Sequence, residues 1–139
     1  MNYKIIGKYI KDLKFEIPNP KAFFLLEKNI SNYKINIDIK SSQVKQNIIE
    51  VLTTLDLHPI KKDFERINTK IVYSTIVELT NNKISKEKIE KIILVEVPTK
   101  IYSELRQIFV FLFENSGFKD VKINEIVDFN KLYKLKKGQ

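Results

Sequence analysis

The sequence predicts an α+β fold in which four antiparallel strands come first and helices follow. Two observations support this prediction. Apolar residues alternate with polar ones through much of residues 3–79, as in half-buried strands, whereas after Ser85 they recur every three or four residues, as in amphipathic helices. Because no repeat or linker divides the 139 residues, we expect a single domain spanning residues 1–139.

The first strand is expected over residues 3–17, where leucine, phenylalanine and isoleucine alternate with charged residues near its end. It must stop at Pro18–Asn19–Pro20, because proline cannot donate a hydrogen bond to a strand ladder. The apolar cluster at residues 22–26 shows no clear period, so we expect it to be part of a connection.

Three further strands are expected along the chain. Residues 33–39 alternate strictly, and Ser41–Ser42 after them is typical of a turn. The next strands are expected at residues 48–57 and 66–79, the last one rich in β-branched residues. Consecutive strands joined by short polar turns imply an antiparallel sheet.

The second half of the chain predicts helices. Ser85 is the expected N-cap of a short helix, and Pro98 precedes a long helix over residues 99–116, with Gly117 suited to its C-terminal cap. A final helix is expected from Asp128. The inward-facing residues of these two helices are expected to be Ile101, Leu105, Ile108, Phe109, Leu112 and Phe113, then Phe129, Leu132, Tyr133 and Leu135.

Three apolar residues of the long helix lie off its main stripe, namely Tyr102, Val110 and Phe111. A helix that is apolar on more than one face usually has more than one partner. The sheet would cover one face and a second subunit the other, so these residues are the candidate oligomer interface. Ordinary core packing is the alternative for each of them.

The composition gives little support to an enzyme. There is no cysteine, the one histidine is His58 beside a proline, and the three glycines are isolated, so no catalytic residues, metal site or phosphate-binding loop can be assigned and no cofactor is expected. No apolar run is long enough to span a membrane and no signal peptide is visible, which predicts a soluble, cytoplasmic protein.

The net charge of +8 leaves a basic nucleic-acid-binding module as the alternative function. However, only Arg66 and Arg106 among the 25 basic residues are arginine, the residue best suited to bidentate phosphate and base contacts. Lysine, isoleucine and asparagine are abundant throughout, which is typical of A/T-rich coding. Nucleic acid is therefore the less favoured partner.

Several motifs in order resemble the SecB family of export chaperones. The segment 11–20, with its Asp, Phe-Glu and Pro-Asn elements, resembles that family's first strand and turn. The segments that resemble its other elements are Ser41–Ser42–Gln43, Tyr73–Val77, Pro98–Arg106, Gly117–Phe118 and Val127–Tyr133. Each motif is weak alone, but together they extend from Lys8 to Tyr133 with compatible spacing.

The resemblance implies a SecB-like fold, a homotetramer built as a dimer of dimers, and a chaperone (holdase) function. Such proteins bind unfolded precursor proteins in apolar grooves and deliver them to the translocation ATPase SecA. An apolar groove of this kind stays soluble when a polar rim surrounds it. By position, the candidate client-binding residues are Phe24, Ile35, Ile37, Leu132 and Tyr133.

The resemblance also implies that SecA docks on an acidic face of the sheet. Asp12 and Glu16 match two of the docking residues, and their even spacing places them on one side of the strand. Where the family has a further leucine and an acidic residue, this chain has Asn68 and Lys70, and it is basic where the family is usually acidic. This departure weakens the expectation of SecA docking more than that of client binding.

Overall fold

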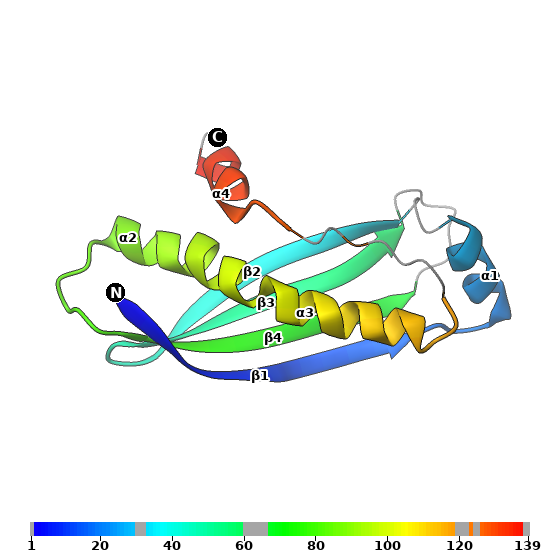
Figure 1. Ribbon diagram of the computed structural model, residues 1–139, viewed down its shortest axis with the longest axis horizontal. Coiled ribbons are helices and arrows are strands. Elements are labelled where there is room, and N and C mark those ends of the chain that lie inside the picture. The colour runs from blue at the N-terminus through cyan, green and yellow to red at the C-terminus, as the bar shows by residue number, and fades with distance from the viewer. Residues whose placement is uncertain (1, 30–32, 60–66, 119–122, 124–125, 138–139) are drawn as a thin grey trace.

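A computed structural model describes residues 2–29, 33–59, 67–118, 123 and 126–137 of the chain (Figure 1). A four-stranded antiparallel sheet carries a long helix across one face, with shorter helices near its ends. The expected α+β fold class is therefore confirmed. The strands are β1 (Tyr3–Glu16), β2 (Tyr33–Lys45), β3 (Ile48–Pro59) and β4 (Asn68–Leu79). The expected start of the last strand at Arg66 lies outside the described residues.

The strand order is β1-β4-β3-β2, so β1 pairs with the last strand and not with the next one along the chain. The connection after β1 contains helix α1 (Pro20–Asn29), which corrects the expectation of an irregular segment at residues 22–26. Asn19 caps this helix, since its Oδ1 accepts a hydrogen bond from the Ala22 amide at 2.8 Å, and Pro20 occupies the first helical position.

The expected turn at Ser41–Ser42 is wrong, because β2 continues through both residues to Lys45. In the ladder Ser41 lies opposite Val51, and the exposed serines belong to a strand edge. The chain reverses at Asn47 instead, with φ of 65°. Asparagine tolerates this left-handed conformation better than most residues, which explains why a tight hairpin turn forms here.

The two expected helices after Ser85 form one continuous rod, consisting of α2 (Lys86–Lys91), the π-helical segment η2 (Ile92–Glu96) and α3 (Val97–Glu114). Ser85 caps it as expected, because its Oγ accepts a hydrogen bond from the Lys88 amide. Pro98 does not separate the helices. It has no amide hydrogen and its ring would clash with the carbonyl of Leu94 in a regular helix, and the wider π turn accommodates both constraints.

Helix α3 packs on the sheet through the expected apolar stripe. Ile101, Leu105, Phe109 and Phe113 are at most 1% exposed, whereas Ile108 and Leu112 are only partly buried. The Phe113 ring lies edge-on to Phe15 of β1, with 5.0 Å between ring centroids. After α3, Gly117 has φ of +93°, the left-handed conformation expected at a helix C-terminal cap.

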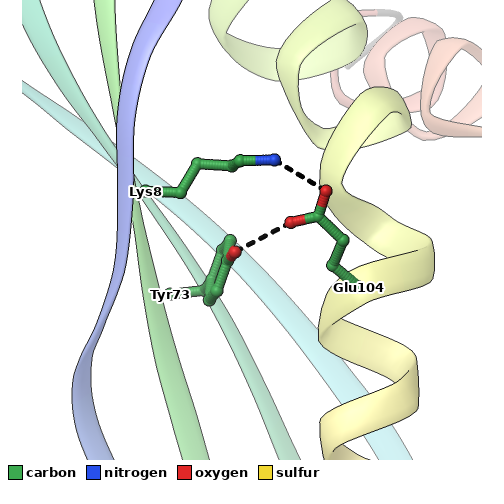
Figure 2. Close-up of polar contacts among 3 residues, drawn as sticks. All are labelled: Lys8, Tyr73 and Glu104. Atoms are coloured by element: carbon green, nitrogen blue, oxygen red, sulfur yellow. Dashed lines mark hydrogen bonds and ion pairs between the residues drawn. The ribbon is translucent and has the colours of Figure 1, made fainter.

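A polar clamp also joins α3 to the sheet (Figure 2). Glu104 of α3 accepts hydrogen bonds from Lys8 Nζ of β1 at 2.7 Å and from Tyr73 Oη of β4 at 2.8 Å. The bonds from Lys8 and Tyr73 lower the pKa of Glu104. Burial and the bond to Glu104 raise the pKa of Tyr73 to about 12, so its hydroxyl remains a donor. The clamp therefore holds α3 over the two strands with Glu104 ionised.

We predict that Glu104→Gln lowers the free energy of unfolding at neutral pH. Because the pKa of Glu104 is lower in the folded state, its ionised form stabilises the fold above the ordinary glutamate pKa of about 4.3, and this contribution is lost as the pH falls through the folded-state value. Urea denaturation of the wild type and of Glu104→Gln measures the two free energies of unfolding. The difference between them should narrow as the pH is lowered from neutral through the pKa range of glutamate.

The matched control for this experiment is Glu114→Gln, which changes an exposed glutamate at the end of the same helix. This control substitution should change the free energy of unfolding little, both at neutral pH and in acid. If Glu104→Gln is less stable than the wild type by the same amount in acid as at neutral pH, the role assigned to the ionised carboxylate is contradicted.

Candidate functional site

A mostly apolar cleft of about 170 Å³ lies between edge strand β2, the segment η2 and helix α4 (Phe129–Lys137). Apart from Asp38, every side chain that lines it is apolar or aromatic. The lining residues are Ile37, Asp38, Ile39, Leu94, Phe129, Leu132 and Tyr133. The cleft is small, so it can accept one or two apolar side chains of a ligand and not a folded domain.

Two further hollows continue the cleft along β2. Leu94 lines both the cleft and the next hollow, of about 240 Å³. Ser41, Ile89 and Ile93 line that hollow together with the last one, of about 390 Å³, which lies near the β2–β3 turn. The three hollows therefore form a row beside residues 37–43 of β2, a stretch of roughly 20 Å in an extended chain.

The outer edge of β2 has no strand beside it among the described residues, because β2 is the last strand of the sheet. An edge strand presents unpaired backbone amide and carbonyl groups. An extended polypeptide can bind such an edge by adding a strand, while neighbouring pockets receive its alternate side chains. The row of hollows and the open edge together form the candidate site, which we call the β2 groove.

A ring contact positions helix α4 on α3, a local cap begins the helix, and a hydrogen bond from α3 holds the connection before it. Phe129 is 2% exposed, and its ring centroid lies 5.9 Å from that of Tyr102 in α3. Asp128 caps the helix by accepting a hydrogen bond from the Lys131 amide at 3.0 Å, and Arg106 donates to the carbonyl of Ile123 in the preceding connection. The wall of the cleft on this side therefore depends on α3.

The structure brings together three of the five expected client-binding residues, because Ile37, Leu132 and Tyr133 all line the cleft. Ile35 lies on the same face of β2 and packs against the core without lining the cleft. Phe24 is 57% exposed on α1, next to Phe23, and α1 lies beyond the opposite end of the sheet from α2 (Figure 1). Phe24 therefore does not belong to the β2 groove.

The sequence reasoning missed several residues of the groove. Ile35 and Ile37 were selected by position, and the alternation of isoleucines in this strand continues to Ile39, so the strand pattern could have found this residue. No comparable signal existed for Leu94, because its position depends on the π-helical turn before Pro98. Leu135 was expected to face inward but is 59% exposed, because Phe129 and Tyr133 occupy the inner side of α4.

The three candidate interface residues have different environments. Tyr102 is 4% exposed and packs inside its own chain, so it has almost no surface left for a second subunit. Val110 is half-buried, and Phe111 is 62% exposed. Edge strand β1 also carries exposed apolar side chains, including Ile10, which is 44% exposed, and Leu13, which is 45% exposed.

Asp12 and Glu16 lie on the face of the sheet opposite α3, which we call the open face. Both are exposed. The ladder places Asp12 opposite Val72 and Glu16 opposite Asn68, and Lys14 between them lies opposite Lys70. Asn68 and Lys70 therefore lie directly beside the two acidic residues, so this corner of the open face carries both charge signs.

A second polar cluster on the open face surrounds Glu50 of β3. Tyr9 Oη and Ser74 Oγ donate hydrogen bonds to it at 2.6 and 2.7 Å, and Lys11 Nζ lies 3.6 Å away. The bonds from Tyr9 and Ser74 and the charge of Lys11 lower the pKa of Glu50. Tyr9 is the one aromatic side chain that the described strands place on this face, so the face lacks the row of stacking rings typical of a nucleic-acid-binding sheet.

The described residues offer little for catalysis or metal binding. His58 is exposed at the end of β3, and its Nε2 lies 3.0 Å from Asp56 Oδ1. No group of three or more histidine, aspartate or glutamate side chains that could hold a metal ion occurs in the described part of the chain. None of the helices that the structure describes is long and apolar enough to cross a membrane.

This arrangement, a helix-backed antiparallel sheet with an apolar groove along a free edge, is that of a polypeptide-binding protein. Residues 1–139 match the family described as preprotein translocase subunit SecB. The chain is 41% identical over 133 residues to the putative protein-export protein SecB of Pelagibacter ubique, covering 96% of this chain and 95% of that protein. It is 28% identical to protein-export protein SecB 1 of Gluconobacter oxydans, covering 95% and 80%.

Among solved structures, the fold is similar to a SecB-like chaperone of Mycobacterium tuberculosis, determined in complex with a ChAD peptide from an antitoxin. The TM-score is 0.66, with 8% sequence identity over 91% of this chain and 88% of that one. The chain thus belongs to the SecB family, which confirms the resemblance that its motifs indicated, and it is a protein-export chaperone. The family match does not support the nucleic-acid-binding alternative.

Proposed function

We propose that this chaperone holds unfolded precursor proteins in the β2 groove, without catalysing a reaction, and that it does so in the cytoplasm as a single-domain subunit. The observation that carries the proposal is a row of hollows, mostly apolar near α4 and mixed near the β2–β3 turn, beside a strand edge that has no neighbouring strand in the described part of the chain. Backbone pairing along β2 would give affinity that does not depend on sequence, and the hollows would select segments with apolar side chains.

The energetics fit transient holding. Burying one large apolar side chain contributes about 1.5–3 kcal/mol, while ordering each residue of an unfolded segment costs about 1–2 kcal/mol. A segment therefore needs several apolar side chains, spaced to reach successive hollows, before binding becomes favourable. Unfolded precursors expose such segments and folded proteins do not.

We predict that Leu132→Asp weakens the binding of unfolded precursor by about tenfold or more, because it places a charge in the apolar cleft. Leu132 is 48% exposed, so the change should leave the fold intact. Fluorescence anisotropy with a labelled, chemically unfolded precursor measures the affinity. The matched control is Val44→Asp, which changes a residue of β2 that is 59% exposed and outside the three hollows. Equal affinities of the two variants would remove the cleft from the binding site.

We further propose that the active form is a homotetramer, a dimer of dimers in which Phe111 and Val110 of α3 contact another subunit. The support is the exposed apolar surface of α3 and of edge strand β1, which a single chain leaves in contact with water. Tyr102 plays a different part, since it anchors α4 within the subunit.

Light scattering coupled to size-exclusion chromatography should give the mass of four chains for the wild type and a smaller assembly for Phe111→Asp, since a charge in an apolar interface is costly. Val44→Asp is again the control, because it adds the same charge at a similarly exposed position. A wild-type protein that elutes as a monomer would refute the tetramer while leaving the β2 groove to be tested by anisotropy.

The open face is the proposed docking surface for SecA, through Asp12 and Glu16. Its lysines and acidic residues nearly balance, which distinguishes it from an acidic surface and requires a partner surface of mixed charge. The charged residues of this face are Lys4, Lys11, Lys14, Lys34, Lys40, Lys45 and Lys70, and Asp12, Glu16, Asp38, Glu50, Asp56 and Glu78.

We predict that the double variant Asp12→Ala/Glu16→Ala binds SecA several-fold more weakly, because exposed charge pairs each contribute up to about 1 kcal/mol. Its affinity for unfolded precursor should be unchanged, since neither residue lines the groove. Surface plasmon resonance measures the affinity for SecA, and fluorescence anisotropy measures the affinity for unfolded precursor. The control Glu27→Ala/Glu114→Ala removes two exposed acidic residues from α1 and α3. If both double variants bind SecA like the wild type, the docking residues lie elsewhere.

A further inference from the structure

Helix α4 carries a large share of the positive charge of this chain. Seven lysines and six acidic residues lie on the open face, so most of the net charge of +8 comes from elsewhere. The nine residues Phe129–Lys137 include four lysines and no acidic residue. The lysines are Lys131, Lys134, Lys136 and Lys137.

The described side chains of α4 divide between two sides of the helix. Phe129 and Tyr133, one turn apart, pack toward the core. Lys131, Lys134 and Leu135 are exposed, and Leu135 lies one turn after Lys131 on the same side. Helix α4 lies at the margin of the molecule, near the C-terminus (Figure 1). Leu135 therefore lies exposed beside Lys131, and it is also one turn after Leu132 at the margin of the β2 groove.

We propose that the outer side of α4, formed by Lys131, Lys134 and Leu135, docks on the surface of an anionic phospholipid bilayer. The lysines complement the negative headgroups, and Leu135 can enter the boundary between headgroups and acyl chains while the lysine stems lie along it. Nucleic acid would use the lysines but would gain nothing from an exposed leucine. The combination of charge and apolar exposure thus favours a membrane surface.

The expected affinity of one helix is modest. Each lysine near an anionic bilayer increases binding about fivefold, and one short helix gives only weak, reversible attachment. If the chaperone is the proposed tetramer, several copies of α4 act together and the apparent affinity rises by avidity. The multivalent step rests on the proposed function, whereas the lipid contact of each helix does not.

Co-sedimentation with vesicles tests the proposal. The full-length protein should bind vesicles of equal parts phosphatidylglycerol and phosphatidylcholine, bind pure phosphatidylcholine vesicles far more weakly, and dissociate as salt is added. Lys131→Gln/Lys134→Gln should reduce binding about 25-fold per subunit, the product of two fivefold steps. Leu135→Ser should reduce it several-fold without changing the charge.

The matched control is Lys21→Gln/Lys28→Gln, which removes two exposed lysines from α1 and should bind vesicles like the wild type. If both lysine double variants lose vesicle binding equally, net charge alone drives the binding. If Leu135→Ser binds vesicles like the wild type, Leu135 makes no apolar contact with the bilayer. Either result overturns the proposal. A third outcome would also overturn the proposal: the wild type binds a single-stranded RNA but not vesicles, and Lys131→Gln/Lys134→Gln loses the RNA binding. This result would assign the surface to nucleic acid. Anisotropy with unfolded precursor on the same variants shows separately whether the β2 groove works.

Discussion

The packing of α3 against the sheet is the interaction on which the rest of the molecule depends. Its buried phenylalanines, leucine and isoleucine each contribute about 1.5–3 kcal/mol, and Glu104 adds a polar clamp to β1 and β4. This packing places Tyr102 where it can hold Phe129, and Phe129 in turn places α4 beside β2. The cleft therefore exists because a helix far from β2 in sequence is held firmly over the sheet.

The sheet assigns different surfaces to different contacts. One edge, β2, borders the row of apolar hollows, and the other edge, β1, exposes apolar residues suited to another subunit. The open face carries nearly balanced charges around the partly buried carboxylate of Glu50, whereas the charge excess is prominent on α4. Because each proposed contact lies on its own side of the fold, we expect substitutions to alter client binding, assembly and docking separately.

Much of this architecture was predictable from local patterns, and the errors have identifiable causes. The alternation in residues 33–39 and the stripe from Ile101 to Phe113 gave the strand and the helix correctly. The turn placed at Ser41–Ser42 failed because polar residues also occur on an open strand edge. The break placed at Pro98 failed because a π turn can absorb a proline within a helix. Three of the five residues predicted by position from the family resemblance, Ile37, Leu132 and Tyr133, line the cleft, and their role in client binding stays a prediction.

By itself the sequence determined the fold class and the family motifs, because these depend on local periodicity and on which residue types are present. Only the tertiary structure decided that β1 pairs with β4, that Tyr102 is buried against Phe129, and that Leu94 and Ile37 meet across one cleft. These facts depend on contacts between distant segments, and an apolar residue has the same pattern whether it packs inside, meets a partner or lines a groove.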